Sequence, residues 1–158
     1  MRYRTIEPVN GMPLHLTASP RGLRAIRFGI SENGALNGDE LDPFLEETAA
    51  QLTAYFEGRL TRFDLPLDLE GTSFQKRVWN ALRAIPYGET ISYAQLAEIA
   101  GSPKGFRAVG AANGRNPIPI IVPCHRVIQS GGGLGGYSCG LDVKRMLLDL
   151  ENRYARRG

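Results

Sequence analysis

The chain has 158 residues, a mean hydropathy of −0.22 and a formal net charge of +3 at neutral pH. This length predicts one domain or two small ones, and no apolar run approaches the roughly 20 residues that span a bilayer. The N-terminus has no signal-peptide pattern, so we expect a cytoplasmic protein without a membrane partner. Two cysteines, Cys124 and Cys139, are too few for a disulfide scaffold or a zinc site.

The first 30 residues predict an antiparallel meander. Tyr3 to Val9 and Met12 to Ala18 flank Asn10-Gly11, which is a strong signal for a two-residue hairpin turn. A third strand, Gly22 to Phe28, follows the turn Ser19-Pro20-Arg21. Residues 31–41 have the composition of a loop.

One helix is expected in the rest of this half. Asp42 suits its N-cap, Pro43 its first position and Gly58 its end. Its apolar face would contain Phe44, Leu45, Leu52, Tyr55 and Phe56. Residues 60–71 are expected to be extended and to link two subdomains.

Residues 72–158 predict mainly helices. Capping-box patterns begin at Thr72 and at Ser92, and a third helix is expected from Ser102-Pro103 to about Asn113. The second and third of these helices are joined by a tight turn at Gly101. This arrangement is typical of a helix-turn-helix, with the third helix as the recognition helix.

The third predicted helix carries small and basic residues. Lys104 and Arg107 would share one face of it. Small side chains let a helix approach a DNA groove closely, but they equally allow close packing against another helix. These small residues are Gly105, Ala108, Gly110, Ala111 and Ala112.

Charge is distributed unevenly along the chain. Residues 1–71 carry 7 Arg and 11 Asp or Glu, a balance of −4, whereas residues 72–158 carry 12 Lys or Arg and 5 Asp or Glu, a balance of +7. A basic half favours a polyanionic partner such as nucleic acid, although a solvated basic face gives the same composition.

The segment 120–128 places Cys124 beside His125 in one of the most apolar runs of the chain. A thiol buried among Ile and Val should have a raised pKa and stay inert unless a neighbour stabilises the thiolate. Adjacent residues of an extended chain point in opposite directions, so a direct contact requires a turn at Pro123 or a bridging water.

The candidate base and its orienting group follow from the few histidines and carboxylates near Cys124 or on predicted helices. The chain has two histidines, and His15 lies in a predicted strand, where a structural role is expected. His125 is therefore the candidate base. Glu151, on a predicted C-terminal helix, could orient it, although an isolated glutamate there could equally be a surface residue.

Residues 131–136 form a glycine-rich stretch after the candidate nucleophile. It lacks the spacing and the lysine of a phosphate-binding loop. We interpret it as the wall or lid of a pocket, with Tyr137 and Ser138 as donors, or alternatively as a plain surface loop.

The segment Pro123-Cys124-His125-Arg126-Val127 resembles the signature of the O6-alkylguanine-DNA alkyltransferases. Further segments are similar to that family in the same order along the chain. These are Pro86-Tyr87-Gly88, Ile91-Ser92-Tyr93, Arg107-Ala108-Val109-Gly110, Asn116-Pro117 and Gly135-Gly136-Tyr137-Ser138. The resemblance is dense from about residue 72 to 151 and weak before that.

The resemblance implies a repair protein that flips an O6-alkylated guanine out of double-stranded DNA. The alkyl group would move to the protein's own cysteine, once per molecule, with O4-alkylthymine as a further expected substrate. Cys124 resembles the acceptor, and His125 with Glu151 the water-linked relay that deprotonates it. Asn116 resembles the residue that organises this segment, and Tyr93 the hydroxyl that contacts the flipped base and its phosphate.

The DNA-binding and pocket residues are implied in the same way. Arg107 resembles a finger that enters the base stack through the minor groove, where small residues suit the narrow fit. The Cys124 and Val127 carbonyls would accept from the exocyclic amine of the base. The DNA-binding set comprises Tyr93, Lys104, Arg107, Ala108, Gly110 and Ala111, and the base-pocket set Pro119, Val127, Gly135, Tyr137 and Ser138.

The implied fold is α+β. Residues 1–71 would form a small antiparallel-sheet, ribonuclease-H-like subdomain, and residues 72–158 a helical, winged helix-turn-helix-like domain carrying the active site. Some family members bind zinc through N-terminal cysteines, but this chain has no cysteine before Cys124. We therefore expect no metal, no cofactor and no obligatory protein partner, and a monomer.

Three other functions are compatible with parts of the pattern. A cysteine hydrolase or acyltransferase would also use Cys124 and His125, but would turn over repeatedly and leave the basic half unexplained. A lesion-binding protein without chemistry would not need Cys124. A plain transcription factor would leave the Pro-Cys-His-Arg segment unexplained.

Overall fold

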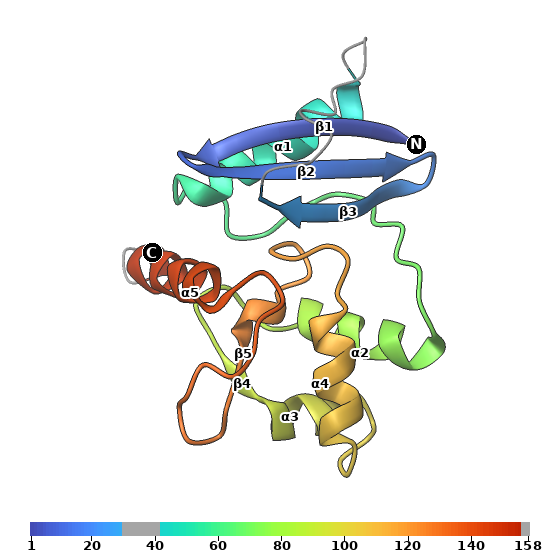
Figure 1. The fold of residues 1–158 in the computed structure, drawn as a ribbon, viewed down its shortest axis with the longest axis vertical. Coiled ribbons are helices and arrows are strands. Elements are labelled where there is room, and N and C mark those ends of the chain that lie inside the picture. Colours follow the sequence, from blue (N-terminus) through green and yellow to red (C-terminus); the bar gives the residue numbers. More distant parts are fainter. Residues whose placement is uncertain (30–41, 156–158) are drawn as a thin grey trace. The chain divides into compact units, whose positions relative to one another are not determined.

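The computed structural model describes residues 1–29 and 42–155, so the loop predicted over 31–41 lies outside the described residues. The chain divides into two compact units, Met1–Leu69 and Glu70–Gly158. The first holds an antiparallel sheet and one helix, and the second is mainly helical (Figure 1). The predicted α+β class is confirmed.

Unit 1 is built on a three-stranded antiparallel meander, as predicted. Strands β1 (Arg2–Val9), β2 (Met12–Ser19) and β3 (Gly22–Phe28) pair in that order. The Asn10-Gly11 turn closes the first hairpin, because Val9 pairs with Met12. Gly11 has φ +82°, the left-handed conformation that this kind of turn favours.

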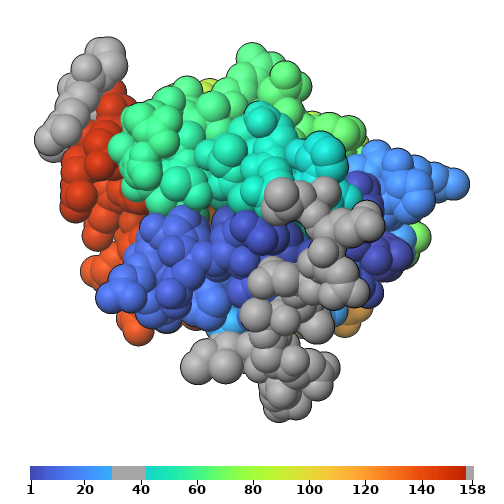
Figure 2. Space-filling view, turned by 90° about the horizontal axis from the view of Figure 1, so that it is seen from above, coloured from blue at the N-terminus to red at the C-terminus, as the bar shows by residue number. Residues whose placement is uncertain are grey.

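Helix α1 (Pro43–Phe56) packs on this sheet, and the atoms of β1 and α1 meet in the space-filling view (Figure 2). Asp42 caps it by accepting from the Leu45 backbone N–H at 3.0 Å, and Gly58 follows its end with φ +76°. The unit's core combines side chains of both elements: Leu14, Leu16, Ile26, Leu45, Leu52 and Tyr55.

His15 has the structural role expected of it. Its Nδ1 lies 2.9 Å from Thr5 Oγ1 and its Nε2 lies 2.6 Å from the Gly29 carbonyl. Both ring nitrogens are therefore engaged in joining the strands of unit 1.

The segment predicted to link the two subdomains is hydrogen-bonded to unit 1 along part of its length. Leu67 forms a parallel bridge with Leu23 at the start of β3, and the Leu23 N–H donates to the Pro66 carbonyl at 2.9 Å. A Cβ at Gly22 would lie 2.4 Å from that carbonyl oxygen. Only glycine therefore allows the two backbones to approach so closely.

Unit 2 begins with three helices. They are α2 (Ser73–Arg83), α3 (Tyr93–Ile99) and α4 (Phe106–Gly114). The two predicted capping boxes are confirmed, with Thr72 and Gln75 on α2 and Ser92 and Gln95 on α3. The buried Trp79 of α2 donates from Nε1 to the Ala112 carbonyl of α4 at 2.9 Å, which fixes α4 on α2.

The remaining elements of unit 2 surround the Cys-His segment. A 3₁₀ turn, η1 (Cys124–Arg126), leads into β5 (Val127–Ile128), which pairs in parallel with β4 (Ile91–Ser92). Helix α5 (Leu141–Ala155) packs against η1. Within the described residues, no helix is both long and apolar enough to cross a membrane.

The predicted start of α4 was wrong. The helix begins at Phe106, not at Pro103, because residues 102–105 form a turn in which the Gly105 N–H donates to the Ser102 carbonyl at 2.8 Å. Lys104 therefore lies before the helix and does not share a helical face with Arg107. A proline at a first helical position and a proline in a turn look alike in sequence.

Candidate active site

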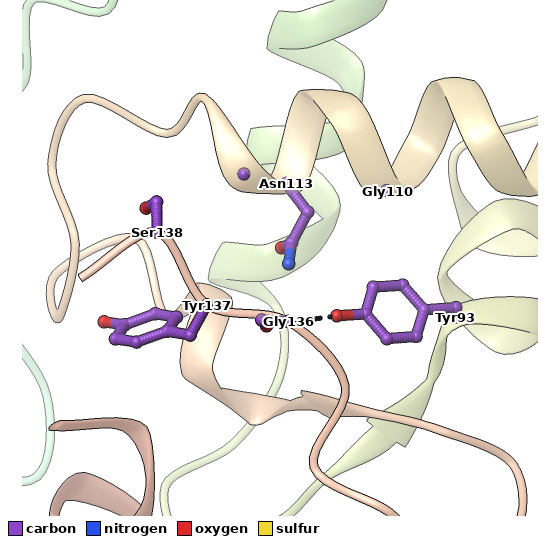
Figure 3. Close-up of a pocket in the computed structure, with 7 residues that line it drawn as sticks. Tyr93, Gly110, Asn113, Gly136, Tyr137 and Ser138 are labelled. Carbon is purple, nitrogen blue, oxygen red and sulfur yellow. Dashed lines mark hydrogen bonds between the residues drawn. The ribbon is translucent and has the colours of Figure 1, made fainter. Parts of the chain in front are cut away.

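A pocket of about 350 Å³ lies in unit 2 between α3, α4 and the loop that follows β5 (Figure 3). Four of its lining residues, Tyr93, Gly110, Tyr137 and Ser138, were predicted to contact DNA or the base. The complete lining is Tyr93, Gly110, Asn113, Gly114, Gly136, Tyr137 and Ser138. Of the glycine-rich stretch, Gly136 lines the pocket, and Tyr137 and Ser138 continue the lining after it.

The loop and α3 approach each other closely at this pocket. Tyr93 donates from its hydroxyl to the Gly136 carbonyl at 3.4 Å. A Cβ at Gly135, which has φ +72°, would lie 2.9 Å from the Tyr93 ring. Burial raises the pKa of Tyr93, so the hydroxyl remains a protonated donor at neutral pH.

Cys124 is buried, with 2% of its surface exposed, and opens the 3₁₀ turn. Burial raises the pKa of its thiol to about 11, against the smaller lowering effect of the nearby Asn116 and Tyr137 side chains. Ionising such a thiol at pH 7 costs about 5 kcal/mol. Cys124 is therefore a thiol at rest.

The Cys-His pair lies on a turn, which is one of the two arrangements that the sequence left open. Arg126 N–H donates to the Pro123 carbonyl at 3.0 Å and closes the turn. The His125 side chain is fully buried, and its Nε2 lies 2.6 Å from Glu151 Oε2. Its Nδ1 is buried and has no hydrogen-bond partner among the described residues, which leaves that nitrogen able to receive a proton.

Glu151 is ionised and His125 is neutral at pH 7. Burial by itself would raise the pKa of Glu151, but His125 and Arg126 outweigh it and hold the pKa at about 2. Burial lowers the pKa of His125, and this effect exceeds the upward pull of Glu151. The imidazole is thus an unprotonated base oriented by a carboxylate.

Arg126 balances the charge of Glu151. Its Nε donates to Glu151 Oε1 at 2.7 Å and its Nη2 to Oε2 at 3.0 Å, while Nη1 donates to the Ile85 carbonyl at 2.6 Å. Because the guanidinium already compensates the buried carboxylate, His125 does not need to carry a positive charge to stabilise it.

Asn116 organises the chain before Cys124. Its Nδ2 donates to the Val122 carbonyl at 2.7 Å, and its Oδ1 accepts from the Ile118 N–H at 2.9 Å. Between these contacts the buried Ile120 has φ +76°, a strained conformation for a β-branched residue that costs about 1–3 kcal/mol. The buried Pro119 lies within this turn and not in the pocket lining.

Lys144 of α5 is fully buried and donates three hydrogen bonds from its Nζ. They reach the carbonyls of Val127 at 2.6 Å, Gly136 at 3.2 Å and Leu134. The ammonium also lies 5.9 Å from the centre of the Tyr93 ring. Lys144 thus holds β5, the glycine-rich loop and Tyr93 together around the pocket.

The exposed face of α4 next to Arg107 carries small side chains. Ala108 and Ala111 are exposed beside the exposed Arg107, whereas Val109 and Ala112 point into the core. Arg107 makes no hydrogen bond or ion pair with any residue in the described ranges 1–29 and 42–155. Its guanidinium is therefore available to a partner.

Two family models match the chain along most of its length. One, described as the 6-O-methylguanine DNA methyltransferase ribonuclease-like domain, matches residues 1–69, and the other, described as the DNA binding domain, matches residues 73–153. The chain belongs to the 6-O-methylguanine DNA methyltransferase family. Its expected family is thereby confirmed.

Relatives support the same family over the whole chain. A methylated-DNA–protein-cysteine methyltransferase of Methanosarcina acetivorans is 49% identical over 154 residues, covering 96% of this chain and 98% of its own. One of Mycobacterium tuberculosis is 61% identical over 105 residues, covering 66% and 64%. A crystal structure of Mycobacterium tuberculosis OGT in complex with DNA matches with a TM-score of 0.82 and 45% identity, covering 98% and 94%.

Sequence reasoning missed three residues of this methyltransferase site: Asn113, Arg126 and Lys144. For Lys144 a sequence signal was available. The buried face of α5 is formed by positions i, i+3 and i+7, which are Lys144, Leu147 and Glu151, and a lysine on such a face indicates a buried charge. Val127, predicted to contact the base, is fully buried in β5, and its carbonyl accepts from Lys144.

Replacing Lys144 with methionine is expected to lower the free energy of unfolding by about 2–4 kcal/mol, because buried carbonyls lose their donor. Urea unfolding would measure the change. Arg145→Met is the matched control, since Arg145 is exposed on the same helix. Equal midpoints for the two variants would contradict the role of Lys144 as an internal clamp.

Proposed function

We propose that this protein repairs DNA by transferring an alkyl group from the O6 atom of a flipped-out guanine to Cys124, once per molecule. The observation that carries the proposal is the buried Cys124 thiol at the start of a turn whose next residue, His125, is a neutral base oriented by the ionised Glu151. Residues 72–158 would carry both DNA binding and transfer.

Base flipping follows from the position of the thiol. A base inside a duplex cannot present its alkyl carbon to a buried sulfur, so it must leave the stack at a cost of a few kcal/mol. The pocket between Tyr93 and Tyr137 would receive it (Figure 3). Because the lining of this pocket and the thiol come from the same unit of one chain, we propose that the protein acts as a monomer.

The transfer step is a displacement at a saturated carbon. The Cys124 proton passes to His125 Nδ1, directly or through a water, and the imidazolium formed is stabilised by Glu151. The sulfur then bonds to the alkyl carbon as the bond from carbon to O6 breaks. The electron pair of that bond remains on guanine, which takes a proton from a donor such as Tyr93 or Tyr137 or from the imidazolium.

The product explains single use. A thioether has no carbonyl that water could attack, so the alkylated cysteine is not regenerated by hydrolysis. No cofactor is needed in this scheme, because the nucleophile, the base and the donors are all side chains of the protein. Both cysteines are free thiols, which suits the cytoplasm that we propose as its compartment.

On the DNA side, α4 is the proposed recognition helix. Ala108 and Ala111 would allow its backbone to enter the narrow minor groove, with Gly110 at the pocket edge. Arg107 would insert into the stack and fill the space left by the flipped base. Lys104, in the turn before the helix, would contact a phosphate.

Replacing Arg107 with alanine is expected to slow repair of a duplex containing O6-methylguanine by about 10- to 100-fold, because nothing then fills the vacated stack. Reaction with free O6-benzylguanine should be unchanged, since a free base needs no flipping. Single-turnover rates on both substrates would measure this. Lys104→Ala is the matched charge control and should mainly weaken DNA affinity. If Arg107→Ala slows reaction with both substrates equally, Arg107 does not act by inserting into the base stack.

Intact-mass analysis after mixing with a duplex carrying one O6-methylguanine tests the proposed function. The expected result is one added methyl group, mapped to Cys124, that stops at one equivalent. Repeated turnover would instead favour a cysteine hydrolase, and unchanged mass with retained lesion binding would favour a binding protein. A matching duplex with O4-methylthymine tests the second proposed substrate.

A further inference from the structure

Asn113 is a polar pocket residue to which the proposed reaction gives no role. It lies on α4, is 4% exposed, and lines the pocket. Figure 3 shows its amide pointing from the helix into the space between Tyr137 and Tyr93. The other two residues of α4 that line the pocket, Gly110 and Gly114, have no side chains, so Asn113 supplies the polar side-chain atoms of this wall.

One end of this amide lacks a partner. Asn113 Oδ1 is buried and accepts no hydrogen bond from any residue that the structure describes. Buried polar atoms in native proteins nearly always have a partner, because an unsatisfied one retains its desolvation cost. An orphan acceptor that faces a substrate pocket is therefore explained most directly by a donor on the substrate.

Tyr93, on the opposite side of the pocket, does not satisfy this oxygen. Its hydroxyl donates to the Gly136 carbonyl at 3.4 Å, and Asn113 Oδ1 accepts no hydrogen bond from it. Burial raises the pKa of Tyr93 and the nearby Asn113 side chain acts to lower it, so the two side chains are close enough to interact across the pocket.

The chemistry of the lesion identifies the donor. Alkylation at O6 removes the proton from N1, and N9 is bonded to the sugar, so the exocyclic amine is the only N–H group of O6-alkylguanine. That amine has two hydrogens and can donate to two acceptors. The resemblance implies the Cys124 and Val127 carbonyls as acceptors, and the Val127 carbonyl also accepts from Lys144 at 2.6 Å, whereas Asn113 Oδ1 accepts no hydrogen bond from any described residue. O4-alkylthymine has no N–H group on its base.

We propose that Asn113 Oδ1 accepts a hydrogen bond from the exocyclic amine of the flipped base and so favours guanine lesions over lesions that lack this amine. This inference rests on the proposed function. It makes Asn113 a specificity-determining residue, distinct from the groups that move the proton or accept the alkyl group.

A comparison of two substrates and two proteins isolates this hydrogen bond. The substrates are identical duplexes containing O6-methylguanine or O6-methylhypoxanthine, which differ only in the amine. Single-turnover rates would be measured for the wild type and Asn113→Leu. We expect the wild type to prefer O6-methylguanine, and the leucine variant to lose about tenfold on that substrate alone, the effect of one hydrogen bond.

Asn113→Asp separates the acceptor from the donor end of the amide. It keeps an acceptor oxygen at the same distance, so the preference for O6-methylguanine should survive even if its charge slows both reactions. A leucine variant that melts at or above the wild-type temperature shows that slower reaction is not due to unfolding. Removal of an unsatisfied buried oxygen makes that outcome expected.

The failures of the two proposals are distinguishable. If the wild type transfers no methyl group from O6-methylguanine, the proposed function fails. If the wild type transfers it but Asn113→Leu slows both duplexes equally, the proposed function stands and the amine contact is overturned.

Discussion

Replacing Cys124 with alanine is expected to abolish methyl transfer completely while leaving lesion binding intact. The sulfur is the only atom lost from a residue that is 2% exposed, so the pocket walls should keep their positions. A small cavity would cost about 1 kcal/mol of stability. Intact mass would report transfer, and fluorescence anisotropy with a labelled lesion duplex would report binding.

Cys139→Ala is the matched control for this experiment. Cys139 is the second free cysteine of the chain and is half-buried beside Ser138 in the loop after β5. Burial raises its pKa too, and no histidine is adjacent to it in the sequence. Its variant should accept one methyl group at the wild-type rate. Methylation of Cys139 in the Cys124→Ala protein would contradict the assignment of Cys124 as sole acceptor.

Replacing Glu151 with glutamine is expected to give the second-largest effect. The variant leaves Arg126 buried without a counter-charge, which costs about 3–5 kcal/mol of unfolding free energy. Transfer should slow by about 100-fold or more, because His125 loses the carboxylate that orients it and stabilises its cation. Urea unfolding and single-turnover rates measure the two losses separately.

The acid stability of the protein tests the same network. The pKa of Glu151 is about 2 in the folded protein against 4.5 as its ordinary value, so its ionised form stabilises the fold above about pH 4.5. That contribution, about 3 kcal/mol, is lost as the pH falls from about 4.5 towards 2. Glu151→Gln should lack this pH dependence, whereas Glu98→Gln, an exposed control on α3, should keep it. Parallel acid-unfolding curves for wild type and Glu151→Gln would contradict the role of this carboxylate.

Local sequence patterns predicted most of the fold. The Asn10-Gly11 turn, the Asp42 cap and the capping boxes at Thr72 and Ser92 all formed where they were expected. Each of these depends on hydrogen bonds between residues two or three positions apart, so the information is contained in a few neighbouring side chains. The family also follows from the sequence, because its motifs are contiguous and in order.

The start of α4 was not predictable from the same evidence. Ser102-Pro103 suits a helix start and a turn equally well, and the structure has the turn. For the segment around Cys124 the sequence similarly left a turn at Pro123 and a bridging water open, and the structure has a 3₁₀ turn. Asn116, six residues before Val122 in the chain, stabilises this conformation by donating to the Val122 carbonyl. The burial of the Ile120 and Val122 side chains in the core offsets the cost of the strained backbone.

The sequence alone thus determined the elements, their caps and the identity of the reactive segment. Only the tertiary structure decided which partners the buried charged groups have. Arg126 donates to Glu151, 25 residues away, and Lys144 donates to the Val127 carbonyl, 17 residues away. It also left Asn113 Oδ1 as an unpartnered acceptor facing the pocket. Partners of buried polar groups depend on how elements pack, and a single sequence contains no local signal that specifies them.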